Sequence, residues 1–161
     1  MLASSVNGGT SWTLTTAPFS RCTGGNPANL GDYARATDPW VTISANNGVA
    51  YALSLSFTGA SLSPGSSSAM LVARSTDFGV TWLQPHALIV DPPNPSGAQF
   101  FNDKGSITAD PLNASFVYAV WDRLSSQTTG PSYLALTADG GSTWQPARSS
   151  SMTRARSRPT R

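Results

Sequence analysis

Glutamate is absent from the 161 residues of this chain, and the only lysine is Lys104. Helices usually draw on both residue types for their solvent-exposed faces, so this composition argues against a helical domain. The only cysteine, Cys22, cannot form a disulfide bond within the chain; it is a free thiol or has a partner in another chain. No run approaches about 18 consecutive apolar residues, which excludes a membrane-spanning helix.

Positive charge is also scarce outside the end of the chain. Five of the ten basic residues fall in the last fourteen positions, so the remainder is mildly acidic. We therefore expect no nucleic-acid-binding surface on the folded part. Residues 149–161 have no apolar alternation and are predicted to form a basic disordered tail, with a nucleic-acid-binding arm as the functional alternative. The abrupt end of the pattern favours a change of reading frame near Ala147.

What the chain does contain is a repeat. Segments 5–12, 75–82 and 137–144 share the pattern Ser/Thr-x-Asp/Asn-x-Gly-x-Ser/Thr-Trp, and we call them the three box segments. Their tryptophans stand 70 and then 62 positions apart. Apolar residues make up 39% of the chain, which is enough for a core. A motif recurring at this spacing indicates a repeat architecture.

The residues between the box segments read as short strands separated by Gly, Pro and Asn turns. Each unit has two strands joined by a turn, a polar loop, a third strand that leads into the box, and a fourth strand directly after it, as at 81–84. Four antiparallel strands at this period describe a propeller blade. The sequence therefore predicts an all-β fold: a partial β-propeller of about two and a half four-stranded antiparallel blades. The predicted parts are the end of a preceding blade (1–16), a long inter-blade loop (17–37), a blade (38–90), a second inter-blade loop (91–102), a blade with an incomplete last strand (103–148) and the tail (149–161).

Each residue type in the box suits a tight turn. An Asp or Asn side chain accepts hydrogen bonds from backbone N–H groups, here expected one to three residues further on. Gly supplies the backbone angles that the turn needs, the Ser or Thr hydroxyl closes the loop, and the Trp covers the apolar end of the blade.

The repeated pattern resembles the Asp-box, or BNR repeat, of sialidases and related β-propellers. The resemblance covers about residues 1–148, with Asn7 as a mild departure because it accepts the same hydrogen bonds as Asp. In these propellers the boxes lie on the blade periphery, away from the active site. The resemblance therefore implies a structural role for Asn7, Gly9, Trp12, Asp77, Gly79, Trp82, Asp139, Gly141 and Trp144.

The resemblance implies a fragment of an exo-α-sialidase-type glycoside hydrolase that is inactive alone. Sialidases resemble one another in using three arginines for the substrate carboxylate, a Tyr nucleophile helped by a Glu, and an Asp acid/base. Because this chain has no Glu, it cannot supply the Tyr–Glu couple. The alternative is a non-catalytic Asp-box propeller that binds glycan or protein.

Candidate site residues lie where the first strand of each blade begins, because ligands bind at that face of a propeller. The loops expected there are 17–39, 58–68, 84–104 and 122–131. Asp38 and Arg35 are the catalytic candidates, as acid/base and carboxylate-binding group. Arg123, Lys104 and Asp103 are the substrate-binding candidates. Segment 103–110 matches segment 38–45, so Asp103 and Lys104 are expected one blade after Arg35 and Asp38, with Asp103 aligned to Asp38. The alternative is that the acids bond loop backbones and Arg35 pairs with an acid.

The same resemblance indicates the partners. A glycan or glycoconjugate is the expected ligand and an extracellular location is expected, although the chain as given shows no secretory signal. No cofactor and no metal cluster is predicted; a Ca²⁺ site built from carbonyl and Asp oxygens in 17–39 stays open. Two and a half blades expose sheet edges, so we expect the isolated chain to self-associate.

Overall fold

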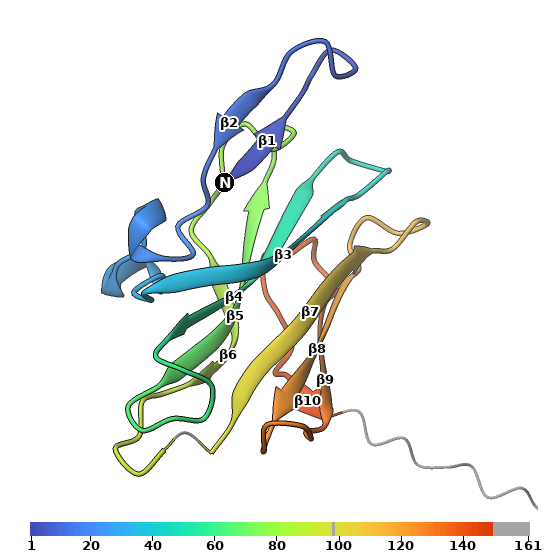
Figure 1. Cartoon of the computed structure of the whole chain (residues 1–161). Coiled ribbons are helices and arrows are strands. Elements are labelled where there is room, and N and C mark those ends of the chain that lie inside the picture. Colours follow the sequence, from blue (N-terminus) through green and yellow to red (C-terminus); the bar gives the residue numbers. More distant parts are fainter. Residues whose placement is uncertain (98, 150–161) are drawn as a thin grey trace, which may run out of the picture.

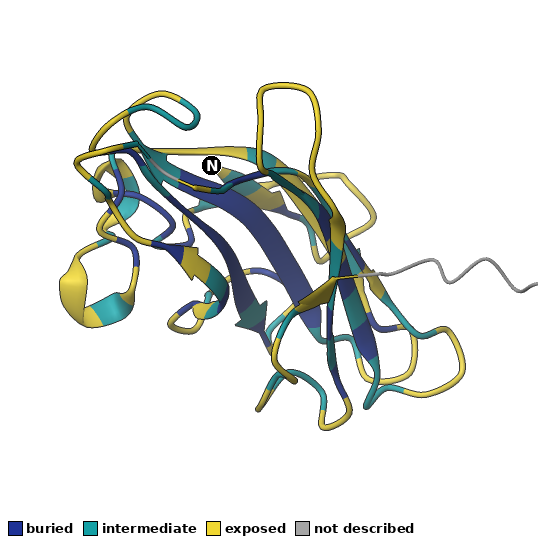
Figure 2. Ribbon diagram, turned by 90° about the horizontal axis from the view of Figure 1, so that it is seen from below, coloured by how far each residue is buried: buried dark blue, intermediate teal, exposed yellow. Residues whose placement is uncertain are grey.

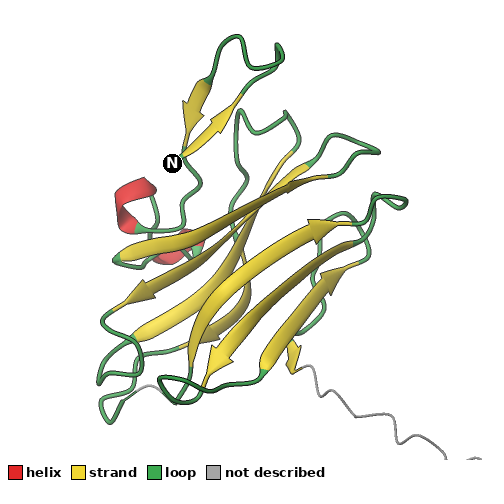
Figure 3. Ribbon diagram, turned by 45° about the vertical axis from the view of Figure 1, so that its right-hand side comes forward, coloured by secondary structure: helices red, strands yellow, loops and turns green. Residues whose placement is uncertain are grey.

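The structure, a computed structural model, describes residues 1–97 and 99–149. These residues form a two-stranded hairpin and two four-stranded antiparallel sheets that face each other (Figures 1 and 3). The first sheet has the strand order β3-β4-β5-β6 and the second β7-β8-β9-β10. The strands are β1 (Leu2–Ser4), β2 (Thr13–Thr15), β3 (Arg35–Ile43), β4 (Ala50–Thr58), β5 (Ser67–Ser75), β6 (His86–Asp91), β7 (Phe101–Ala109), β8 (Val117–Leu124), β9 (Ser132–Thr137) and β10 (Arg148–Ser149).

The only helices in the described residues are two single 3-10 turns, η1 (Arg21–Thr23) and η2 (Pro27–Asn29), and no helix there could cross a membrane. Both turns lie between the hairpin and β3, in the segment predicted as a long loop. Asn26 caps η2, because its side chain accepts hydrogen bonds from the backbone N–H groups of Ala28 and Asn29. The loop is therefore locally ordered by its own polar side chains.

Strands β4 and β5 are the deeply buried strands of the first sheet, and Figure 2 shows buried strands in dark blue. The sequence of β4 alternates small residues with large ones, so the two faces of that strand differ. The large side chains Tyr51, Leu53 and Leu55 join the core between the two sheets. On the other face, Ala52 packs with Phe19 and Leu71 in a second, smaller cluster. Because both faces are covered, β4 is buried along almost its whole length, with alanine and serine on one face and large side chains on the other.

Strand β7 brings the two sheets together, since it contacts β3, β4 and β5. Gly105 permits this approach: a Cβ atom at that position would collide with the side chain of Met70 and lie 3.0 Å from Leu53. The core between the sheets contains the fully buried Ile107 and Trp121. Close packing of this kind leaves little tolerance for added volume.

Strand positions differ from the sequence prediction in three places. The fourth strand of the first sheet is His86–Asp91, whereas the sequence predicted it at 81–84, directly after the box segment. Strand β3 begins at Arg35, so three residues assigned to the loop are in the strand. The third difference concerns register: the equivalent of Asp38 is Lys104, not Asp103. In β3 and in β7, two unpaired residues lie between the paired positions on either side of a β-bulge. Asp38 and Lys104 are the first of these two residues in their strands, and Asp103 corresponds to Thr37. The predicted tail lies outside the described residues, apart from Ser149 in β10.

Candidate functional site

The two ends of the sheets carry different kinds of connection. The three box segments turn at one end, directly after β1, β5 and β9, and the first two of them lie at the top of Figure 1. The loops at 59–66, 92–97 and 125–131 lie at the other end, toward the bottom of the same view, and the 3-10 segment lies at the left beside the start of β3. Loops positioned by a rigid scaffold are where binding residues concentrate. We therefore call this second end the loop end, and place the candidate site there.

The second box segment is held by hydrogen bonds of one carboxylate and two hydroxyls. Asp77 accepts hydrogen bonds from the Thr81 backbone N–H at 2.9 Å and from the Thr81 hydroxyl at 2.5 Å. The Ser75 hydroxyl donates to the Asp77 carboxylate at 2.7 Å and accepts from the Gly79 N–H at 2.8 Å. Asp77 thus bridges four residues ahead, further than the one to three residues that turn statistics suggest.

The other two box segments repeat this network with equivalent atoms. In the third, Asp139 bonds the N–H and hydroxyl of Thr143, at 2.9 and 2.6 Å. In the first, Asn7 accepts from the Ser11 N–H at 3.0 Å and donates its amide N–H to the Ser11 hydroxyl at 2.8 Å. The Asn replacement therefore reverses the direction of one hydrogen bond and preserves the turn.

The third box segment also joins the two sheets. The Tyr51 hydroxyl donates to the carbonyl oxygen of Gly140 at 2.9 Å, and the Arg74 guanidinium donates to the same oxygen and to the Ser142 hydroxyl at 3.2 Å each. Burial raises the pKa of Tyr51, so its phenol stays a donor through the neutral range. In the third box the polar groups are therefore used for the turn and for contact between the sheets.

Acid should weaken two of the three turns. Hydrogen bonds from the Thr81 hydroxyl and backbone, and then from Ser75, lower the pKa of Asp77 from 3.8 to about 2; Asp139 is lowered to about 2 in the same way. A folded-state pKa below the unfolded value stabilises the fold above about pH 4, and that contribution is lost as pH falls from about 4 to 2. We expect Asp77→Asn to flatten the loss of unfolding free energy in this range, measured by urea titration at each pH.

The first box supplies the matched control for this prediction. Asn7 has no carboxyl proton to gain, so Asn7→Asp should add acid sensitivity of the same sign as that of the other two boxes. An identical pH dependence for the wild type and for the Asp77→Asn, Asp139→Asn double variant would contradict the assignment.

The candidate residues Asp38 and Lys104 occupy equivalent β-bulges. Register shifts lie between Thr37 and Trp40 in β3 and between Asp103 and Ser106 in β7. Asp38 and Lys104 have φ angles of 50° and 52°, in the left-handed region that non-glycine residues rarely adopt. The Thr37 hydroxyl donates to the Asp38 carboxylate at 3.2 Å, and the Lys104 ammonium lies 3.3 Å from the Asp103 carboxylate.

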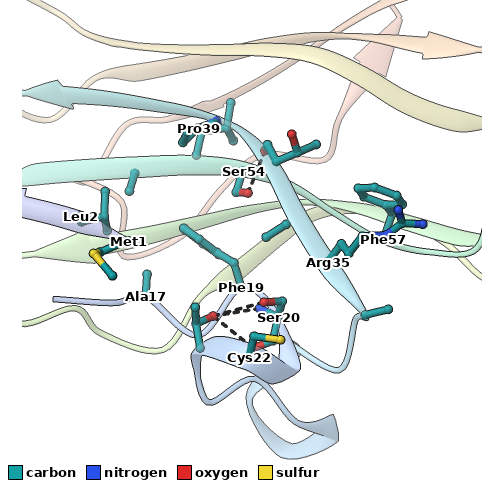
Figure 4. Close-up of a pocket in the computed structure, with 16 residues that line it drawn as sticks. Met1, Leu2, Ala17, Phe19, Ser20, Cys22, Arg35, Pro39, Ser54 and Phe57 are labelled. Carbon is teal, nitrogen blue, oxygen red and sulfur yellow. Dashed lines mark hydrogen bonds between the residues drawn. The ribbon is translucent and has the colours of Figure 1, made fainter.

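Arg35 lies at the start of β3 and lines a cavity of about 590 Å³ between the hairpin, the 3-10 segment and the first sheet. Figure 4 shows its side chain beside Phe57, with the guanidinium carbon 4.7 Å from the ring centroid. The guanidinium also donates to the carbonyl oxygen of Gly59 at 3.2 Å. No acid pairs with Arg35 within the described part of the chain. Its remaining N–H groups are therefore available to a ligand, and the exposed Cys22 lines the same cavity.

Arg123 is placed very differently, because it is fully engaged by protein groups. It forms a bidentate ion pair with Asp91 of β6, and its guanidinium donates to the Tyr133 hydroxyl at 3.1 Å. It also stacks against Phe100, with its central carbon 4.0 Å from the ring centroid. Burial alone would lower the pKa of Arg123, but the bonds to Asp91 and Tyr133 outweigh it and hold the pKa above its ordinary value.

Sequence reasoning missed the partners of Arg123. Asn102 is fully buried between the sheets; its amide donates to Asp91 at 2.9 Å and its carbonyl oxygen accepts the indole N–H of Trp121 at 2.9 Å. No pattern of charged residues indicates this network, since Asp91 stands alone before a proline-rich loop. The structure thus leaves Arg35, Asp38 and Lys104 accessible and gives Arg123 a set of partners.

The described sheets define an all-β, partial β-propeller with about two and a half four-stranded antiparallel blades, and the fold is sialidase-like. Among solved structures, one similar chain is a "Hadza microbial sialidase Hz136", with a TM-score of 0.58 and 18% sequence identity. The match covers 88% of this chain and 29% of that sialidase, so the chain spans less than a third of its length. No family model and no curated protein matches the chain. Among the described residues, no group of three or more His, Cys, Asp or Glu side chains is placed to hold a metal ion.

Proposed function

We propose that this chain is the carbohydrate-facing part of a sialidase-like glycoside hydrolase propeller, with its three box segments acting as structural Asp-boxes. The observation that carries the proposal is the structural similarity to a microbial sialidase over 88% of the chain. The accessible charged residues of the loop end support the proposal. A propeller binds its ligands at one face of the ring, where the first strand of each blade begins.

Arg35 is the residue most suited to the acidic group of such a sugar. A guanidinium presents several N–H donors in a planar fork that matches a carboxylate. Packing on Phe57 and the bond to Gly59 hold the Arg35 side chain, which lowers the entropy lost when a ligand binds. Asp38 is the acid/base candidate, and Lys104 with Asp103 contributes polar contacts on β7, the first strand of the second sheet.

The chain alone should bind without hydrolysing. A Tyr nucleophile needs a neighbouring base, and in sialidases that base is a Glu, which this sequence does not contain. The absence of Glu also favours a second candidate function, a non-catalytic propeller that binds glycan or protein. The two candidates differ in whether the remainder of the parent protein supplies a Tyr–Glu couple.

Titration with N-acetylneuraminic acid, followed by NMR chemical shifts, tests the proposal. We expect Arg35→Ala to weaken binding about tenfold to a hundredfold, the equivalent of about 1.5–3 kcal/mol for hydrogen bonds to a charged group. Arg21→Ala is the matched control, because Arg21 already pairs with Asp32 at 2.5 Å and should not affect affinity. We expect no release of the fluorophore from a fluorogenic sialoside. Equal affinities for the wild type and Arg35→Ala would reject the role of Arg35, and absence of any binding would reject the proposed function.

A further inference from the structure

The guanidinium of Arg74, near the end of β5, uses only one of its three nitrogen atoms in contacts with the protein. Nη1 donates to the carbonyl oxygen of Gly140 and to the Ser142 hydroxyl, at 3.2 Å each. In the described part of the chain, Nε is buried without a hydrogen-bond partner, Nη2 also has none, and no acid forms an ion pair with Arg74. Nε and Nη2 together form an edge of the guanidinium that can bind a carboxylate through two parallel hydrogen bonds.

The repeat shows that this position does not need a guanidinium for packing. The residue directly before each box segment is Ser4, Arg74 or Leu136. Ser4 makes the equivalent contact one unit earlier, since a Cβ atom on Gly79 would lie 3.4 Å from the Ser4 Cβ. A Cβ atom on Gly141 would likewise lie 3.5 Å from the Cδ of Arg74. A small hydroxyl side chain therefore suffices for the contact with the next box, and Arg74 adds a charge that this contact does not require.

Arg74 lines a cavity of about 290 Å³ between the start of β6 and the third box segment, at the opposite end of the sheets from the loop end. Val72, the buried Pro85 and Trp144 give the cavity apolar walls. The exposed His86 also lines it and offers a further ring nitrogen for hydrogen bonding. The volume is below the range of about 300–1,000 Å³ that is typical of sites for drug-sized ligands, so a ligand here must be small.

One acid, Asp139, acts on the same region without neutralising Arg74. Burial raises the pKa of Tyr51, and the charges of Arg74 and Asp139 then act on that phenol in opposite directions. The Asp139 carboxylate accepts hydrogen bonds from Thr137 and Thr143 and is exposed, so water and salt screen its charge. The unpartnered edge of Arg74 therefore keeps a positive charge beside apolar walls.

We propose that this cavity binds a single carboxylate through the Nε–Nη2 edge of Arg74, while Nη1 keeps its bonds to the third box segment. The carboxylate belongs to a small organic acid or to an acidic side chain of a protein partner, which present the same group. Binding gives the buried Nε donor an acceptor, so the ligand should also raise the stability of the fold. The site is separate from the candidate carbohydrate-binding face and does not rest on the proposed function.

NMR of the full chain tests the site, with sodium acetate as the probe and sodium chloride at equal ionic strength as the reference. We expect a saturable shift of the Arg74 Nε–Hε signal and of the Ser142 amide signal with acetate and none with chloride. Arg74→Lys keeps the charge without the fork, so the Ser142 signal should report acetate binding about tenfold weaker. Arg74→Leu, which copies the residue type of Leu136, should abolish both this shift and the acetate-dependent rise in melting temperature.

Arg21→Ala is the matched control, because Arg21 pairs with Asp32 and its loss should leave the response to acetate unchanged. A tripeptide with a central glutamate, compared with its glutamine analogue, distinguishes the two sources of the carboxylate. Binding of the glutamate peptide as tightly as acetate indicates a protein partner, and binding of acetate alone indicates a small acid. Wild-type affinity for acetate in Arg74→Lys would overturn the proposal even if Arg74→Leu fails to fold. Equal shifts with acetate and chloride would overturn it as well.

Discussion

Replacing Asp91 with alanine is expected to destabilise the fold by about 3 kcal/mol, because it leaves the Arg123 guanidinium buried without its counter-charge. The side chains of Arg123 and Asp91 are only 16% and 8% exposed, so water cannot replace the lost carboxylate. Asn102 loses a partner at the same time, since its amide donates to Asp91. A loss of this size is a large fraction of the stability of an ordinary domain.

The midpoint of urea unfolding measures this effect, and a double variant controls it. Replacing both Asp91 and Arg123 with leucine removes the charges together, and we expect it to cost less than Asp91→Ala alone. Arg21→Ala should cost less than about 1 kcal/mol, because the Arg21–Asp32 pair is exposed. A cost below about 1 kcal/mol for Asp91→Ala would show that the pair does not hold the sheets together.

Trp121→Ala is expected to destabilise the fold by about 3–5 kcal/mol. The indole is 2% exposed in the core between the sheets, and its N–H donates to Asn102. Its removal therefore creates a cavity and leaves a buried acceptor without a donor. Trp121→Phe retains much of the volume and should lose mainly the hydrogen bond.

Trp12→Ala is the corresponding surface control, because that indole is 63% exposed. Unfolding monitored by circular dichroism should show a midpoint close to that of the wild type, as expected for an exposed position. Similar losses for Trp12→Ala and Trp121→Ala would mean that the sheet-to-sheet core contributes less than its burial indicates.

The fold was accessible from the sequence because its signal is local. Each box pattern lies within eight residues, and turn residues have specific chemistry that does not depend on distant partners. Two local features illustrate this. The hydrogen bonds of Asp77 and Asp139 lie within their own box segments, and small and large residues alternate along the sequence of β4. The structural roles given to the box residues, like the site roles of Arg35 and Asp38, stay predictions.

Register and pairing were less accessible, because they depend on contacts between distant residues. The turn between β3 and β4 has six residues and that between β7 and β8 has seven, so no single offset aligns the two units along their whole length. Asp103 was matched one residue away from its structural position, and a slip of one residue places a side chain on the other face of its strand. The Asp91–Arg123 pair spans 32 residues, and no local pattern predicts it.

The separation of the box turns from the loop end has an evolutionary consequence. A hairpin whose turn is closed by its own hydroxyls and carboxylate can be copied in tandem without any compensating change in the sequence beside it. Duplication can therefore add units while the opposite rim diversifies, since insertions there leave the turn intact. Two rates of sequence change are expected along each unit, slow at the hairpin and fast at the rim.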